Sequence, residues 1–73
     1  MNLSEAKKLN SGDYIYHKIK TNADGTPMRA KLTSVKTWKR SPERIELRYK
    51  RGLKEFGVID EQEIEDFGVG YGS

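Results

Sequence analysis

The sequence predicts an all-β fold: a strongly bent sheet of four or five antiparallel strands, closed or nearly closed, with a short helix or helical turn at each end. One observation is alternation, because charged residues separate Ile45, Leu47 and Tyr49 and so place the apolar side chains on one strand face. The other is that short runs of β-branched and aromatic residues recur between turn signals. A chain of 73 residues with this pattern forms one domain.

Residues 1–10 are expected to form a helical lead. Ser4 is a suitable N-cap, and Leu3 and Leu9 fall on one side of the helix that would follow. A helix this short is marginal alone, so we expect it to pack on the sheet.

The first strand is predicted over residues 14–20, after a dense turn signal. Its aliphatic residues, Ile15 and Ile19, are expected to face the core. This choice leaves Tyr14 and Tyr16 on the outer face, where they either form a binding platform or pad the rim of the sheet.

A hairpin loop is predicted over residues 21–27 and a long strand over residues 28–40. The strand contains a break in phase, because Leu32 and the next aliphatic residue, Val35, do not alternate. An extra residue near Thr33 would restore the phase, which predicts a β-bulge at Thr33 and Ser34.

The alternating strand around Leu47 is followed by a predicted reversal at Arg51 and Gly52. Phe56 and Val58 are expected to supply the inward row of the returning strand. Residues 60–67 then predict a short helical turn, and the glycine-rich residues 68–73 a flexible tail. The predicted core consists of Leu9, Ile15, Ile19, Ala30, Leu32, Val35, Ile45, Leu47, Tyr49, Phe56, Val58, Ile64 and Phe67.

Charge is distributed unevenly along the chain. Residues 26–54 carry ten Lys and Arg against two Glu, whereas residues 55–73 carry six acidic residues and no basic one. A basic block of this size attracts polyanions or acidic protein surfaces. The alternative is that the acidic segment folds back and neutralises the basic one.

Several function classes find no support in the residues. There is no cysteine, no signal-peptide pattern and no run long enough to span a bilayer, so we expect a cytoplasmic protein without membrane contact. His17 has no nucleophile motif to serve and is expected at the rim or in the core. The acidic residues after 59 lack calcium-loop spacing, so no metal site is predicted. No set of residues meets the requirements for nucleophile, base and oxyanion together, so no enzymatic activity and no cofactor are predicted.

The candidate site is the outer, basic face of the sheet. Aromatic rings interleaved with Lys and Arg suit nucleic acid, because the charges hold phosphates and the rings stack on bases. The predicted nucleic-acid-binding residues are Tyr14, Tyr16, Lys36, Trp38, Lys39, Arg40, Arg44, Arg48 and Lys50.

The order of these features resembles a known group. Gly12 and Asp13 open the first strand, and a loop, two long strands, a hairpin at Arg51 and Gly52 and a final helical turn follow. Over residues 11–67 this resembles the SH3-like small barrels, including the KOW and Tudor-like groups. Three further runs, 22–27, 36–40 and 59–67, resemble small uncharacterised bacterial proteins, some of them from phage or prophage regions.

Two functions are therefore expected. The first is a non-catalytic module that binds DNA or RNA through its basic, aromatic-bearing sheet face. The second is a protein-interaction module or adaptor that docks an acidic protein surface, and the resemblance to phage-region proteins implies a phage-related role for it. The sequence does not indicate an oligomeric state.

Overall fold

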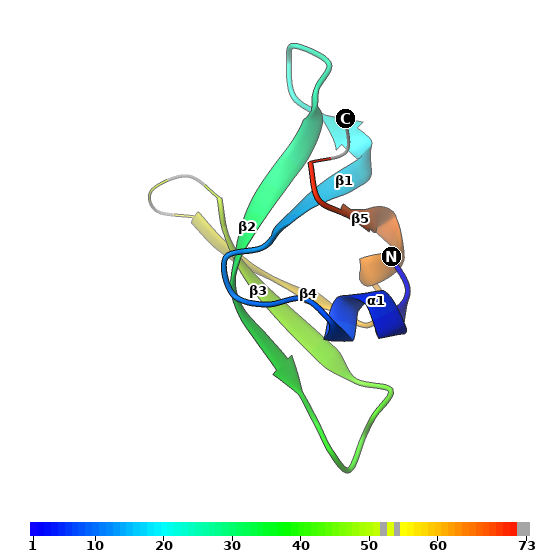
Figure 1. Cartoon of the computed structure of the whole chain (residues 1–73). Coiled ribbons are helices and arrows are strands. Elements are labelled where there is room, and N and C mark those ends of the chain that lie inside the picture. The colour runs from blue at the N-terminus through cyan, green and yellow to red at the C-terminus, as the bar shows by residue number, and fades with distance from the viewer. Residues whose placement is uncertain (52, 54, 72–73) are drawn as a thin grey trace.

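The structure is a computed structural model that describes residues 1–51, 53 and 55–71. Its five strands are β1 (Tyr14–Thr21), β2 (Pro27–Thr37), β3 (Ile45–Arg51), β4 (Glu55–Asp60) and β5 (Phe67–Val69). They form one antiparallel sheet in the order β4-β3-β2-β1-β5 (Figure 1). The prediction of an all-β fold is thus confirmed, and of the four or five antiparallel strands expected the structure has five.

The sheet is not closed into a barrel, which corrects the first of the two forms expected, closed or nearly closed. Closure requires hydrogen bonds between the two edge strands, and β4 and β5 do not pair. β5 has three residues and pairs along its length with β1. The helix α1 (Leu3–Lys7) and the 3₁₀ helix η1 (Ile64–Asp66) lie across the open side of the bent sheet instead (Figure 1).

The helix α1 begins two residues earlier than predicted. Asn2, not Ser4, is the N-cap: its side chain accepts a hydrogen bond from the Glu5 N–H at 2.8 Å. The Glu5 carboxylate in turn accepts one from the Asn2 N–H at 3.1 Å. This reciprocal pair needs a glutamate three residues after the cap, a condition that Asn2 meets and Ser4 does not.

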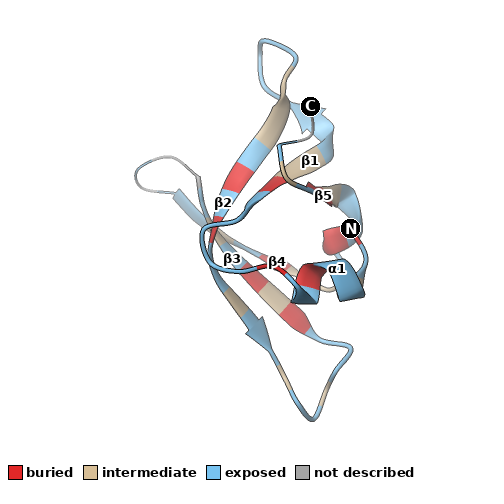
Figure 2. Cartoon of the chain, viewed as in Figure 1, coloured by how far each residue is buried: buried red, intermediate tan, exposed pale blue. Residues whose placement is uncertain are grey.

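The core lies between the concave face of the sheet and the two helices (Figure 2). Seven predicted core residues are buried, and Val35, Tyr49 and Phe67 pack against them partly buried. Met1, Ala6 and Ile59 also belong to the core and were missed. The buried apolar residues are Met1, Ala6, Leu9, Ile15, Ala30, Leu32, Ile45, Leu47, Ile59 and Ile64.

The predicted phase of β4 is wrong by one residue. Phe56 and Val58 are 70% and 51% exposed, whereas Ile59 is 1% exposed. Directly opposed residues in an antiparallel pair share a face, and Ile59 lies opposite buried Leu47. A one-residue slip in phase turns every side chain of a strand to the other face.

Ile19 is also misplaced by the prediction, because it is 76% exposed. The register between β1 and β2 shifts after Tyr16. Over this stretch Nδ1 of His17 accepts hydrogen bonds from the backbone N–H groups of Ile19 and Lys20, at 3.1 and 2.9 Å. The backbone therefore departs from regular alternation just before Ile19.

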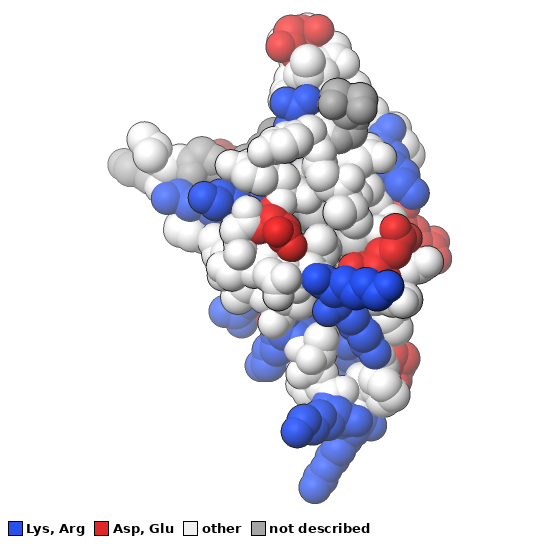
Figure 3. Space-filling model, in the orientation of Figure 1, with Lys and Arg blue, Asp and Glu red and all other residues white. Residues whose placement is uncertain are grey.

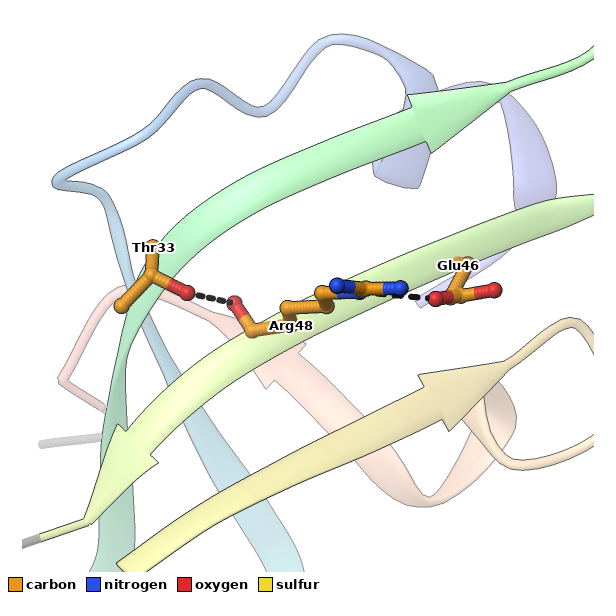
Figure 4. Close-up of polar contacts among 3 residues, drawn as sticks. All are labelled: Thr33, Glu46 and Arg48. Carbon is orange, nitrogen blue, oxygen red and sulfur yellow. Dashed lines mark hydrogen bonds and ion pairs between the residues drawn. The ribbon is translucent and has the colours of Figure 1, made fainter. Parts of the chain in front are cut away.

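The predicted β-bulge in β2 is confirmed by a register shift between Leu32 and Ser34. The Thr33 hydroxyl donates a hydrogen bond to the Arg48 carbonyl across the bulge, at 3.2 Å (Figure 4). Because the bulge inserts one residue, Val35 returns to the inner face opposite Leu47.

The hairpin predicted after β3 is present as the β3–β4 pair, although Gly52 lies outside the described residues. The flexible tail predicted from residue 68 is corrected, because Gly68 and Val69 belong to β5 and pair with β1. Gly72 and Ser73 lie outside the described residues. Within the described part of the chain, no helix has the length and apolar character needed to cross a bilayer.

Candidate nucleic-acid interface

The outer face of the sheet is the one turned away from α1 and η1. Strand alternation assigns residues to it: one row runs across four strands through Tyr14, Lys31, Lys50 and Phe56, which are neighbours in the strand register. Two lysines thus stand side by side with an aromatic ring beyond each. This row lies near the middle of β2 and is one part of the predicted site.

The second part is the hairpin end, which we define as residues 36–44. The last cross-strand pair is Thr37 with Ile45, and Trp38 follows it at the start of the loop. The guanidinium carbon of Arg44 lies 4.3 Å from the Trp38 ring centroid, and Nζ of Lys36 lies 5.1 Å from it. Trp38 is half-buried beneath these two cations.

The loop of the hairpin end is braced from two sides. Within it, the Arg44 N–H donates to the Ser41 carbonyl at 2.9 Å. From α1, the Lys7 ammonium donates to the Pro42 carbonyl. Lys7 therefore joins the cations of the hairpin end, which no local sequence signal indicated because the contact spans 35 residues.

Lys39 and Arg40 lie in the same loop and are exposed. The space-filling view places a concentration of Lys and Arg over this end of the molecule (Figure 3). Acidic side chains are more frequent on the opposite parts of the same view.

Arg48 and Lys50 lie along the outer face of β3 and differ in their surroundings. Nε of Arg48 forms an ion pair with Oε1 of Glu46 at 2.9 Å, with the Arg48 side chain 58% exposed (Figure 4). Glu46 therefore offsets part of its charge. Lys50 lies opposite Lys31, and the adjacent like charges raise the positive potential there.

The tyrosines form a separate cluster. Tyr14 packs on Tyr71 with ring centroids 5.0 Å apart, and the Arg29 guanidinium lies 5.4 Å from the Tyr71 ring centroid. Nε of Arg29 also donates to the Tyr71 carbonyl at 2.8 Å. Tyr16 lies half-buried over Gly68, where an added Cβ would come within 2.2 Å of the ring.

The predicted residues therefore do not converge on one spot. Trp38 is seven residues beyond Lys31 along β2, roughly 20 Å at about 3.3 Å per residue. Lys31 is the β2 neighbour of Tyr14. Lys36, Trp38, Lys39, Arg40 and Arg44 come together at the hairpin end, whereas Arg48, Lys50 and the two tyrosines lie farther along the sheet.

The acidic segment does not pair with the basic one among the described residues, where Arg48 with Glu46 is the one ion pair found. Asp60 instead accepts hydrogen bonds from the N–H groups of Gln62 and Glu63, at 2.9 and 3.1 Å. Glu63 also borders a surface cavity of about 480 Å³ on the concave side, together with His17 and cations of β1 and β2. Because both acidic and basic side chains line this cavity, its charge favours neither an anionic nor a cationic ligand.

His17 is engaged structurally. Its Nδ1 is the acceptor for two backbone N–H groups, and its ring packs edge-on against Phe67 with centroids 4.9 Å apart. Among residues 1–51, 53 and 55–71, no group of three or more histidine or acidic side chains is arranged to hold a metal ion.

Comparisons with known proteins were made at three levels. No family model matches the chain, and neither the curated proteins nor the solved structures yield a significant match.

Proposed function

We propose that this protein is a non-catalytic nucleic-acid-binding module that contacts backbone phosphates through its hairpin end. The observation that carries the proposal is that five cations gather there against one acidic residue, Glu43, and that none of the five forms an ion pair among the described residues. Such cations release counterions when they bind a polyanion, which makes the interaction favourable and dependent on salt. The set consists of Lys7, Lys36, Lys39, Arg40 and Arg44.

The chemistry of the hairpin end supports nucleic acid over an acidic protein surface. Protein interfaces are centred on buried apolar or aromatic anchors. No residue from 36 to 44 is among the exposed large hydrophobic residues, and Trp38 is half-buried beneath its cations. A surface of this kind suits phosphates better than a protein interface.

The relation to the SH3-like small barrels rests on the order of elements along the chain, which opens at Gly12 and Asp13 and ends in a helical turn. We propose that the chain is an open variant of that architecture. A relation to phage-encoded proteins and a cytoplasmic location remain proposals from the sequence.

The proposal is tested by fluorescence anisotropy with labelled 20-nucleotide single- and double-stranded DNA and RNA. With about four phosphate contacts the affinity for duplex DNA should fall roughly 150-fold between 50 and 200 mM salt, and that for a single strand roughly 50-fold. The variant Lys39→Gln/Arg40→Gln should lower the salt slope by about two, since each lost contact removes about one. The matched control Lys18→Gln/Lys20→Gln removes the same charge from β1 and should leave the slope nearly unchanged. Absence of binding at 50 mM salt to every probe would overturn the proposal.

A second candidate function rests on a different surface. Phe56 and Val58 are exposed on the edge strand β4 and border, with Thr33 and Arg48, a groove of about 450 Å³. Exposed apolar side chains on a free strand edge are typical of sites that take up an extended peptide. This supports a protein-interaction module. A displayed library of acidic peptides should then enrich sequences on the wild-type chain that Phe56→Lys does not retain, and no enrichment would count against it.

A further inference from the structure

We propose that Trp38 is a positioning residue that holds Arg44 and Lys36 as a phosphate clamp, and that the clamp selects double-helical over single-stranded nucleic acid. This inference rests on the proposed function and names its ligand class. It differs from the expectation drawn from the sequence, in which the Trp38 ring itself stacks on a base.

The first step is the position of the indole. Trp38 follows Thr37, the last residue of β2, and Lys36 lies two residues before it, so alternation places both side chains on one face. Arg44, the residue before β3, reaches the same ring from across the hairpin. The distances of 4.3 Å for Arg44 and 5.1 Å for Lys36 fall within the range of cation–π attraction.

The second step is what this contact does to the cations. A guanidinium that lies over a ring keeps its N–H groups at the edge, where they remain free to donate to phosphate oxygens. Neither Arg44 nor Lys36 forms an ion pair among the described residues. Bracing of the loop through Pro42 and Ser41 further limits their motion, so less conformational freedom is lost on binding.

The third step is the choice of ligand. A base that stacked on Trp38 would have to displace Arg44 or Lys36 from the ring and so forfeit the cation–π contact. A double helix keeps its bases stacked on one another and presents phosphates at a higher linear density than a single strand. Arg44 and Lys36 cover the Trp38 ring and offer donors to phosphates, so the clamp favours the double helix over an unpaired strand.

Trp38 is the one tryptophan in the sequence, so its fluorescence reports on this site alone. The wild-type chain is titrated with duplex and single-stranded DNA of equal length while indole emission and labelled-DNA anisotropy are recorded. Tighter binding of the duplex, with little quenching of the indole, is the expected result. Tighter binding of the single strand with strong quenching would overturn the inference and leave the proposed function standing.

A double-mutant cycle separates positioning from direct contact. Trp38→Ala should weaken duplex binding about twofold to fivefold, the worth of an exposed cation–π contact, while Trp38→Phe retains most of the affinity. In an Arg44→Ala/Lys36→Ala background, Trp38→Ala should have no further effect. Additive losses would overturn the inference.

Two controls keep these outcomes apart. Circular dichroism melting of each variant shows whether it is folded, and Trp38→Leu, which keeps an apolar side chain without an aromatic ring, replaces Trp38→Ala in the cycle if Trp38→Ala is not folded. Polyglutamate serves as a polyanion without phosphates. Binding to polyglutamate but to no nucleic acid would overturn both this inference and the proposed function.

Discussion

The face assignment of β4 makes a quantitative prediction about stability. Ile59 lies opposite Leu47 in the sheet and is 1% exposed, whereas Phe56 on the same strand is 70% exposed. Replacing a fully buried isoleucine with alanine costs about 2–5 kcal/mol, because the side chain loses its burial and leaves a cavity. Surface substitutions away from special features stay within about 0.5 kcal/mol. Ile59→Ala should therefore destabilise the fold several times more than Phe56→Ala.

The size of the domain sets the scale of this effect. A chain of this length has a total stability of about 4–11 kcal/mol, so Ile59→Ala removes a large part of it. At about 4–8 °C per kcal/mol for a small domain, its melting temperature should fall by at least roughly 10 °C. Ile59→Val, with a cost of about 0.5–1.5 kcal/mol, provides a folded variant if the alanine form is too unstable.

Urea unfolding followed by far-ultraviolet circular dichroism measures the stability of wild type, Ile59→Ala, Ile59→Val and Phe56→Ala. Where the dependence of the unfolding free energy on urea concentration is the same, differences in midpoint report differences in stability. If Phe56→Ala proves as costly as Ile59→Ala, β4 presents its other face to the core. The register of the β3–β4 pair would then be wrong, along with the outer face built on it.

Three further predictions follow from local contacts. Asn2→Ala removes the N-cap of α1 and should lower the unfolding free energy by about 1 kcal/mol, while Asn2→Asp preserves it in the same urea assay. The hydroxyl and then the N–H of Thr26 donate to the Asp24 carboxylate and hold its pKa below the ordinary value. The stabilisation by ionised Asp24 is therefore present above its ordinary pKa and lost as pH falls through the lowered pKa. Nuclear magnetic resonance titration should find the pKa of Asp24 below its ordinary value, and Thr26→Ala should raise that pKa. Glu46→Gln removes the carboxylate that lies opposite Lys36 and should strengthen duplex binding in the anisotropy assay; weaker binding would contradict the proposed use of the hairpin end.

The bulge in β2 and the strand around Leu47 were predictable because their signals are local. Alternation states which residues of β3 share a face, and the lost phase between Leu32 and Val35 states where a residue must be inserted. The position of the helix cap was within reach as well, because Asn2 and Glu5 have the spacing of a reciprocal cap.

The composition of the candidate site was only partly predictable. Lys36, Trp38 and Arg44 are close in sequence around one hairpin, so their proximity follows from strand pairing. Lys7 joins them through a contact across 35 residues that no local pattern encodes. Tyr14 has the right chemistry but lies on a different strand, in a row that crosses the sheet far from the hairpin end.

The sequence by itself determined the strand character, the bulge and the gathering of positive charge in residues 26–54, because each depends on neighbours within a few positions. Tertiary structure alone decided which face of β4 is buried. Phe56, Val58 and Ile59 are all apolar, so alternation permits either phase, and only Gly57, opposite Tyr49, leaves room for a ring on the inner face. Tertiary structure also decided that the sheet stays open, since closure depends on whether the two edge strands β4 and β5 pair with each other.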